Sequence, residues 1–141
     1  IIKRLKDASH LINGDFIMFY GDTLSDVNIY KLVEYHKDHP GKATITVWPL
    51  QSQFGLLEFD DKGMICSFQE KPVLDKWINI GYIYCEHSIL SILKNFDSFE
   101  DFLNYLVEKK EMNGFKHKGV HITVNTIKEL EVAKGNIDKI G

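Results

Sequence analysis

The sequence predicts an α/β fold with a mostly parallel sheet and an added β-hairpin. Short apolar runs alternate along the chain with segments of helical periodicity, the order typical of such folds. One run, Phe16 to Tyr20, has five consecutive apolar or aromatic residues between polar turn formers, which indicates a strand buried on both faces. Two segments typical of strands flank Asp60-Asp61-Lys62-Gly63, and this arrangement is a hairpin signal.

The first elements follow from spacing and capping residues. Residues 1–12 carry apolar side chains at helical spacing and predict a helix that leads into the strand at Phe16. Residues 25–28 then supply capping residues for a helix that ends at Pro40-Gly41. β-Branched residues predict the next strand over 42–50.

The predicted hairpin and the strand after it come next. The hairpin strands are expected at 54–59 and 64–68, and Pro72 should stop strand pairing from continuing. Residues 77–85 again have the composition of a strand. Gly81 lies in its interior, where a glycine usually marks a bulge or a close approach by a ligand or another backbone.

The last third of the chain carries clear helix starts. Helices are expected over 87–95 and after Ser98, which resembles a capping residue paired with Asp101. A final strand or strand pair is expected around Gly119. Thr126 follows and forms a capping box with Glu129, which opens the terminal helix.

Size and composition exclude several functional classes. The 141 residues suit about one domain, and the net charge of -3 leaves no basic footprint for nucleic acid. No apolar run approaches the roughly 20 residues that span a bilayer, so we expect no membrane partner and a cytoplasmic location. Cys66 and Cys85 lack a metal-type spacing and should be free thiols. Because the sequence starts at Ile1, we expect it to begin inside a longer protein.

Four short stretches are candidates for one shared site. Each lies at the end of a predicted strand or at a strand glycine, where ligands collect in open α/β sheets. They are Gly21-Asp22, Glu70-Lys71-Pro72, Asn79 to Gly81, and Asn125-Thr126. Each also has a purely structural interpretation: a turn before a helix, a solvated charge pair or the end of a strand.

The order and separation of these stretches resemble the sugar-phosphate nucleotidyltransferases from about Phe16 to Ala133. The glucose-1-phosphate cytidylyltransferases are the subgroup with the best match. The matching segments are FYGDTLSDVNI, LVEYHKDHPGKATITV, QFGLLEF, FQEKP, WINIGYIYCE, FEDFLNYLVEKKEM and KHKGVHITVNTIKELE. The resemblance implies a Rossmann-like nucleotidyltransferase sheet, with residues 1–141 forming the sugar-phosphate-binding portion of a partial domain.

The resemblance also implies a reaction and its catalytic residues. A nucleotidyl group would pass from a nucleoside triphosphate, best matched by CTP, to a sugar 1-phosphate, best matched by glucose 1-phosphate, with release of pyrophosphate. Two polyanions meet in such a reaction, so Mg²⁺ and cationic side chains must neutralise phosphate oxygens. Asp22 matches the metal-binding aspartate of the family, and Lys71 matches the lysine that holds the sugar phosphate.

The resemblance implies sugar contacts as well. Glu70 would accept hydrogen bonds from sugar hydroxyls, and Asn79 would contact the same ring. Gly21 and Gly81 would let ligands approach the backbone. Thr126 completes the predicted substrate-binding set, and Asn125 is the second predicted metal ligand.

Two departures from the family pattern bear on activity. The glycine-rich loop that wraps the triphosphate belongs before Ile1, so we expect the chain to be inactive alone and its sheet to expose apolar surface at one edge. The family usually has an aspartate where this sequence has Asn125, and commonly a tryptophan at His121. Asparagine offers an oxygen without charge, so metal affinity should fall. For His121 we favour a packing or sugar-facing position.

Two functional hypotheses therefore stay open. The first is a sugar-phosphate nucleotidyltransferase. The second is a non-catalytic sugar-nucleotide-binding or interaction module that has lost its metal site, which Asn125 favours. Oligomer formation and association with a missing piece are both consistent with an exposed sheet edge.

Overall fold

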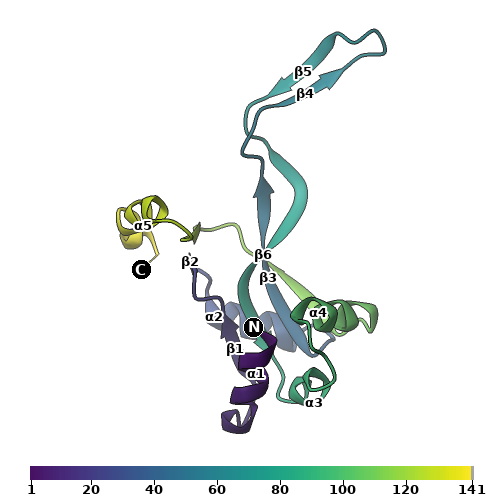
Figure 1. Ribbon diagram of the computed structural model, residues 1–141, viewed down its shortest axis with the longest axis vertical. Coiled ribbons are helices and arrows are strands. Elements are labelled where there is room, and N and C mark those ends of the chain that lie inside the picture. The colour runs from purple at the N-terminus through teal and green to yellow at the C-terminus, as the bar shows by residue number, and fades with distance from the viewer. Residues whose placement is uncertain (141) are drawn as a thin grey trace.

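The computed structural model describes residues 1–140 and folds them into a mixed α/β structure around a four-stranded sheet (Figure 1). The strand order is β1-β6-β3-β7. The elements in chain order are α1 (Ile2–Ala8), η1 (Ser9–Leu11), β1 (Phe16–Phe19), β2 (Thr23–Ser25), α2 (Ile29–Lys37), β3 (Ala43–Gln51), β4 (Leu56–Phe59), β5 (Ile65–Gln69), β6 (Val73–Cys85), α3 (Ile89–Leu93), α4 (Phe99–Glu108), β7 (Met112–Lys116), β8 (His121–Thr123), α5 (Ile127–Lys134) and η2 (Ile137–Lys139).

Strand direction differs in part from the prediction of a mostly parallel sheet. β3 and β7 pair in parallel, but β6 runs antiparallel to both of its neighbours, β1 and β3. β1, β3 and β7 therefore run in the same direction, and β6 runs in the opposite direction between β1 and β3. Direction depends on how the connecting segments cross the sheet, which the apolar pattern of a single strand does not encode.

The prediction that β1 is buried on both faces is wrong. β1 is the edge strand of the described sheet, its first three residues are only half-buried, and Phe19 is 53% exposed. Its apolar run is real, but one backbone edge has no neighbouring strand among residues 1–140. The expected exposed apolar edge is thus observed at β1.

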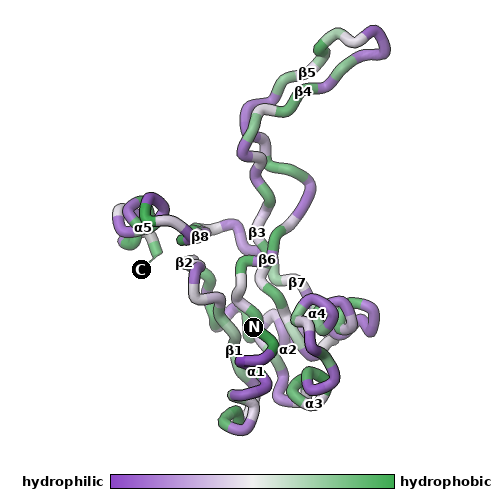
Figure 2. Tube along the Cα trace, viewed as in Figure 1, coloured by the Kyte–Doolittle hydropathy of each residue, from purple (hydrophilic) through white to green (hydrophobic). Residues whose placement is uncertain are grey.

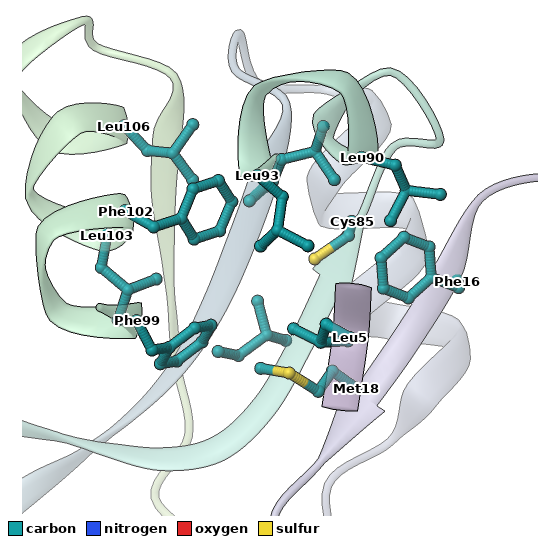
Figure 3. A pocket seen from close by; sticks show the side chains of 13 residues that line it. Leu5, Phe16, Met18, Cys85, Leu90, Leu93, Phe99, Phe102, Leu103 and Leu106 are labelled. Atoms are coloured by element: carbon teal, nitrogen blue, oxygen red, sulfur yellow. The ribbon is translucent and has the colours of Figure 1, made fainter. Parts of the chain in front are cut away.

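The main core lies between one face of the sheet and the helices α1, α3 and α4. Figure 3 shows side chains from α3, α4 and α1 converging on those of β1 and on Cys85 of β6. Their packing leaves a cavity of only about 10 Å³ with no polar lining, which is about the size of one water molecule. This space is a packing defect of the core and not a ligand site.

The other face of the sheet is covered by α2, where a buried polar group replaces part of the apolar packing. His36 lies against the ring of Tyr84, and its Nδ1 is 2.8 Å from the hydroxyl of Thr44. The side-chain amide of Asn113 donates to the same hydroxyl oxygen at 3.3 Å. Buried polar groups require such partners, and these contacts fix α2 on β3 and β6.

The predicted helix starts are confirmed. Asn28 caps α2 by accepting the amide of Lys31, and Ser98 caps α4 by accepting the amide of Asp101. At α5 the capping box is complete. These signals were readable from sequence because donor and acceptor lie within one turn of each other.

Gly81 produces the predicted bulge. Its φ is +79°, and the register between β3 and β6 shifts between Ile45 and Val47, opposite the segment that contains Gly81. A Cβ at this position would lie 2.3 Å from Cγ of Tyr20. The neighbour that requires a glycine here is the side-chain ring of Tyr20, and not the ligand or second backbone that the sequence suggested.

Two small sheets complete the fold. The predicted hairpin, β4 and β5, stands away from the helical layers at the far end of the β3–β6 ribbon (Figure 1), with hydrophobic residues along both strands (Figure 2). The second small sheet pairs β8 with β2, a strand that was not predicted. Among residues 1–140, every helix is too short or too polar to cross a membrane.

Candidate functional site

The chain leaves the central sheet at Tyr20, immediately before the predicted Gly21-Asp22. The amide of Tyr20 donates to the carbonyl of Gly81 at 2.9 Å and extends the pairing of β1 with β6 by one residue. Asp22 then lies at the start of β2 and is exposed. Its carboxylate makes no hydrogen bond or ion pair with residues 1–140, so both oxygens are free to bind a ligand.

Asn125 is brought next to Asp22 by the pairing of β2 with β8. The amide of Val124 donates to the backbone carbonyl of Asp22 at 2.8 Å, which continues the ladder by one rung. Asn125 follows directly and is exposed, and its side-chain amide has no hydrogen-bond partner in the described chain. The backbone segments that carry the two predicted metal ligands are therefore adjacent.

The capping box of α5 holds the backbone at Asn125. The carboxylate of Glu129 accepts the amides of Asn125 at 2.8 Å and Thr126 at 2.9 Å. These hydrogen bonds to the charged form lower the pKa of Glu129. The hydroxyl of Thr126 accepts the amide of Glu129 at 3.2 Å, so the structure gives Thr126 a capping role.

Asn79 and Gly81 meet the same region through Tyr20. The side-chain amide of Asn79 donates to the hydroxyl of Tyr20 at 2.9 Å, and its oxygen accepts the amide of Gly81 at 2.8 Å. Asn79 is exposed, so one amide hydrogen and one lone pair stay available to a ligand. Tyr20 thus joins Asn79, Gly81 and the Gly21-Asp22 turn into one unit.

A groove runs along the open edge of β1 to this unit. Its volume is about 580 Å³, within the range of small-molecule sites, and Gly21 and Asp22 line one end of it. Leu5, Met18 and Phe19 give it apolar walls, and Arg4 adds a cation.

The structure does not bring Glu70 and Lys71 to Asp22. They lie between β5 and β6 at the base of the hairpin, where the carbonyl of Lys71 accepts the side chain of Gln51 at 3.2 Å. Seven residues of mostly extended chain lie between Lys71 and Asn79, a span on the order of 25 Å. Lys71 has a φ of +44°, an uncommon conformation for a residue with a side chain.

Sequence reasoning missed several polar residues around the site. Tyr20 was interpreted only as the end of an apolar strand, although its hydroxyl organises Asn79. His117 and Trp48 were assigned no role. The imidazole of His117 bonds to the carboxylate of Asp26 at 2.8 Å, and the indole of Trp48 donates to the carbonyl of Gly119 at 3.0 Å. No local pattern marks these partners, because each contact joins distant segments.

His121 occupies a packing position, one of the two positions that we favoured for it from the sequence. It lies on β8 with its ring centroid 5.5 Å from that of Trp48, and burial is the main cause that lowers its pKa. A half-buried imidazole next to an indole ring fits a packing position.

Asp22 and Asn125 both carry exposed oxygen donors. Within residues 1–140 no cluster of three or more His, Cys, Asp or Glu side chains could hold a metal by itself. One carboxylate from Asp22 and one amide oxygen from Asn125 are oxygen donors of the kind that Mg²⁺ binds while keeping waters and phosphate oxygens. Both side chains are therefore of the chemical type that Mg²⁺ binds.

Comparisons with known proteins agree on one family. The model of the nucleotidyl transferase family matches residues 2–121. Glucose-1-phosphate cytidylyltransferase of Salmonella typhi is 30% identical over 141 residues, which covers 96% of this chain and 54% of that protein. "Probable glucose-1-phosphate cytidylyltransferase" of Bacillus subtilis (strain 168) is 33% identical over 131 residues, covering 90% and 51%.

Structural similarity supports the fold. A Bacillus anthracis protein assigned as a glucose-1-phosphate thymidylyltransferase, solved in complex with sucrose, superposes with a TM-score of 0.72 at 16% identity. That match covers 100% of this chain and 62% of the other. The chain spans about half the length of the curated relatives that it matches. It belongs to the nucleotidyl transferase family, among the sugar-phosphate nucleotidyltransferases.

Proposed function

We propose that residues 1–141 form the sugar-phosphate-binding portion of a nucleotidyltransferase domain that transfers a cytidylyl group from CTP to glucose 1-phosphate. An oxygen of the sugar phosphate attacks the α-phosphorus of CTP. The bond between that phosphorus and the bridging oxygen to the β-phosphate breaks, and pyrophosphate leaves. The choice of CTP and glucose 1-phosphate rests on relatives that are 30% and 33% identical.

The juxtaposition of Asp22 and Asn125 is the observation that carries this proposal. Two residues whose exposed side-chain oxygens have no partner among residues 1–140 lie on adjacent backbone segments, tied by the 2.8 Å bond from the Val124 amide to the Asp22 carbonyl. Bound Mg²⁺ would neutralise phosphate charge as the transfer proceeds. Asp22 and Asn125 would hold it, with Asp22 supplying the charge.

The sugar would lie beside the Tyr20 unit. Asn79 has hydrogen-bonding capacity to spare, and Gly21 has no atom within 4 Å of where a Cβ would stand, so a ligand has room at its backbone. Gly81 is covered by the ring of Tyr20, so in this proposal it acts by holding Tyr20 and Asn79 in place. In this proposal Thr126 acts by holding the backbone that carries Asn125.

Glu70 and Lys71 form the second half of the proposed site. Lys71 would bind the sugar phosphate and Glu70 the sugar hydroxyls, both from the hairpin base. Because the described structure holds them far from Asp22, this assignment requires the two-stranded β3–β6 ribbon to bend toward β2 when substrate binds. A long two-stranded ribbon has few tertiary contacts to resist such bending.

Asn125 favours a second function, a sugar-nucleotide-binding module without catalysis. Replacing a charged ligand by a neutral one weakens the attraction for a divalent cation. Such a module would use the same groove and the same contact from Asn79, but it would not release pyrophosphate.

The test is pyrophosphate release by the natural full-length protein with Mg²⁺, glucose 1-phosphate and each nucleoside triphosphate in turn. We expect turnover that is fastest with CTP and is abolished by chelation of the metal. Binding of CDP-glucose without any turnover would support the non-catalytic module. Absence of both turnover and binding with every sugar phosphate and sugar nucleotide would overturn both functions.

A further inference from the structure

The ladder that places Asn125 beside Asp22 is short. β2 and β8 pair over three residues each, with Thr23 opposite Thr123, Leu24 opposite Ile122 and Ser25 opposite His121. Two-stranded sheets of this size are marginal, and a slip of one residue turns every side chain to the opposite face. Contacts outside the ladder are therefore needed to hold its register.

Asp26 supplies such a contact at the end of the ladder opposite Asp22. Its Oδ1 accepts the amide of Val120 at 2.6 Å and the Nε2 of His117 at 2.8 Å. A carboxylate can only accept, so Nε2 of His117 carries the proton. Val120 would be the next residue to pair after Ser25 and His121, so the Asp26 side chain takes the place of the next rung.

The loop between β7 and β8, residues 117–120, is also tied to the central sheet. The amide of His117 donates to the carbonyl of Val47 at 2.9 Å, so His117 extends the pairing of β7 with β3 by one residue. The indole of Trp48 donates to the carbonyl of Gly119 at 3.0 Å, and the hydroxyl of Ser25 donates to the carbonyl of Val120 at 2.6 Å. Through His117, Asp26 connects the small ladder to the main sheet.

The contact between Asp26 and the loop leaves no room for a side chain at Gly119. A Cβ at position 119 would lie 2.3 Å from Oδ1 of Asp26 and 2.7 Å from Cε1 of His117. Any side chain there would displace the carboxylate. The bond from Asp26 to the loop therefore depends on a glycine at this position.

We propose that Asp26 is a positioning residue that sets the register of β8 on β2 and so keeps Asn125 beside Asp22. The consequence for metal binding rests on the proposed function, whereas the effect on register does not. The ladder is then fixed at both ends, by Asp26 on Val120 and by the carbonyl of Asp22 on Val124.

The test compares Asp26→Ala with Asp26→Asn by amide hydrogen exchange of Val124. Loss of the two hydrogen bonds should accelerate exchange at Val124 about tenfold in the alanine variant. The asparagine variant keeps an oxygen acceptor and should stay within about twofold of the natural protein. Asp60→Ala is the matched control, because Asp60 also accepts two hydrogen bonds through one carboxylate oxygen, from the backbone amides of Lys62 and Met64 in the hairpin turn.

Metal binding gives the second readout. Mn²⁺ titration followed by broadening of the Asn125 resonance should need about tenfold more metal in Asp26→Ala and recover in Asp26→Asn. If the natural protein shows no Mn²⁺ effect at Asn125, the proposed metal site fails, and exchange at Val124 still decides the role of Asp26.

Unchanged exchange at Val124 in Asp26→Ala overturns the proposal, as does an asparagine variant as perturbed as the alanine variant. If Asp26→Ala does not fold, Gly119→Ala replaces it, because the added methyl group displaces the carboxylate without removing it. Faster exchange at Val124 in that variant supports the role of Asp26. If Val124 in Gly119→Ala exchanges at the same rate as in the natural protein, the role of Asp26 is overturned.

Discussion

The backbone carbonyl of Asp22 accepts a hydrogen bond from the amide of Val124 at 2.8 Å. This bond joins the exit of β1 to the entry of α5 and brings the backbone of Asn125 next to that of Asp22. A divalent cation placed there has one charged and one neutral protein ligand, so the charge at position 125 should control its affinity.

Asn125→Asp should therefore tighten metal binding. A second carboxylate at an exposed position adds about 1 kcal/mol or more of attraction, so half-saturation with Mn²⁺ should fall by about five- to tenfold. Asp22→Ala should weaken Mn²⁺ binding by a larger factor than Asn125→Asp strengthens it. Mn²⁺ titration measures both variants, and equal affinity in Asn125→Asp and the natural protein would show that Asn125 is not a ligand.

Gly21→Ala separates a structural from a ligand-binding role for this glycine. No atom lies within 4 Å of the position that a Cβ would occupy, so the melting temperature should stay within about 2 °C. If a ligand approaches the backbone here, the methyl group should raise the KM or Kd for sugar phosphate about tenfold. Unchanged binding would remove Gly21 from the site.

Gly81→Ala should be strongly destabilising because its φ is +79° and the new methyl group would enter the ring of Tyr20. We expect a loss of about 3 kcal/mol in the free energy of unfolding, measured by urea denaturation. Gly14→Ala is the matched control, since nothing lies within 4 Å of its Cβ position, and it should change stability by about 0.5 kcal/mol or less. Similar values for both variants would contradict the bulge geometry.

Lys71→Ala and Lys71→Gly should differ in stability but not in function. Both lose the ammonium group, so binding of sugar phosphate should weaken about tenfold or more in each. Only glycine adopts a φ of +44° without strain, so Lys71→Gly should be about 1 kcal/mol more stable than Lys71→Ala. Lys110→Ala is the control, since its φ is +57° at the end of α4, and it should leave binding unchanged.

If either Lys71 variant binds sugar phosphate as tightly as the natural protein, Lys71 is not the phosphate ligand. A loss of binding confined to Lys71→Ala would instead assign the effect to backbone strain. Isothermal titration with glucose 1-phosphate distinguishes these outcomes.

Alkaline pH should destabilise the protein through Cys85. Burial raises the pKa of the Cys85 thiol to about 12 from an ordinary value of 9.0. Below pH 9 the thiol is neutral in both states. Above it the unfolded thiol ionises while the buried one stays protonated, so the free energy of unfolding falls by up to about 1.4 kcal/mol per pH unit as pH rises toward 12.

Cys85→Ala should remove that part of the pH dependence, whereas Cys66→Ala should not, because Cys66 is exposed. Urea denaturation at a series of pH values between 8 and about 11 measures the slopes. A thiol reagent such as dithiobisnitrobenzoate should modify Cys66 at once and Cys85 only after unfolding. Equal reactivity of both thiols would contradict the burial of Cys85.

Local signals were read correctly from the sequence. The caps at Asn28 and Ser98, the capping box at Thr126 and the turn at Asp60 each involve groups within a few residues of one another. The bulge at Gly81 was also predicted, because a glycine inside a strand is informative without knowledge of its neighbours. The motif order was enough to indicate the family.

What the sequence by itself determined is the helix starts, the turns, most of the strands and the family that the motifs share. The tertiary structure alone decided that β6 runs against its neighbours, that β1 lies at an edge, and that β2 pairs with β8. It also decided that Asn125 lies beside Asp22 while Lys71 lies far from both. The physical reason is that hydrogen bonds between distant segments leave no periodicity or composition in either segment, so their partners are visible only once the chain is folded.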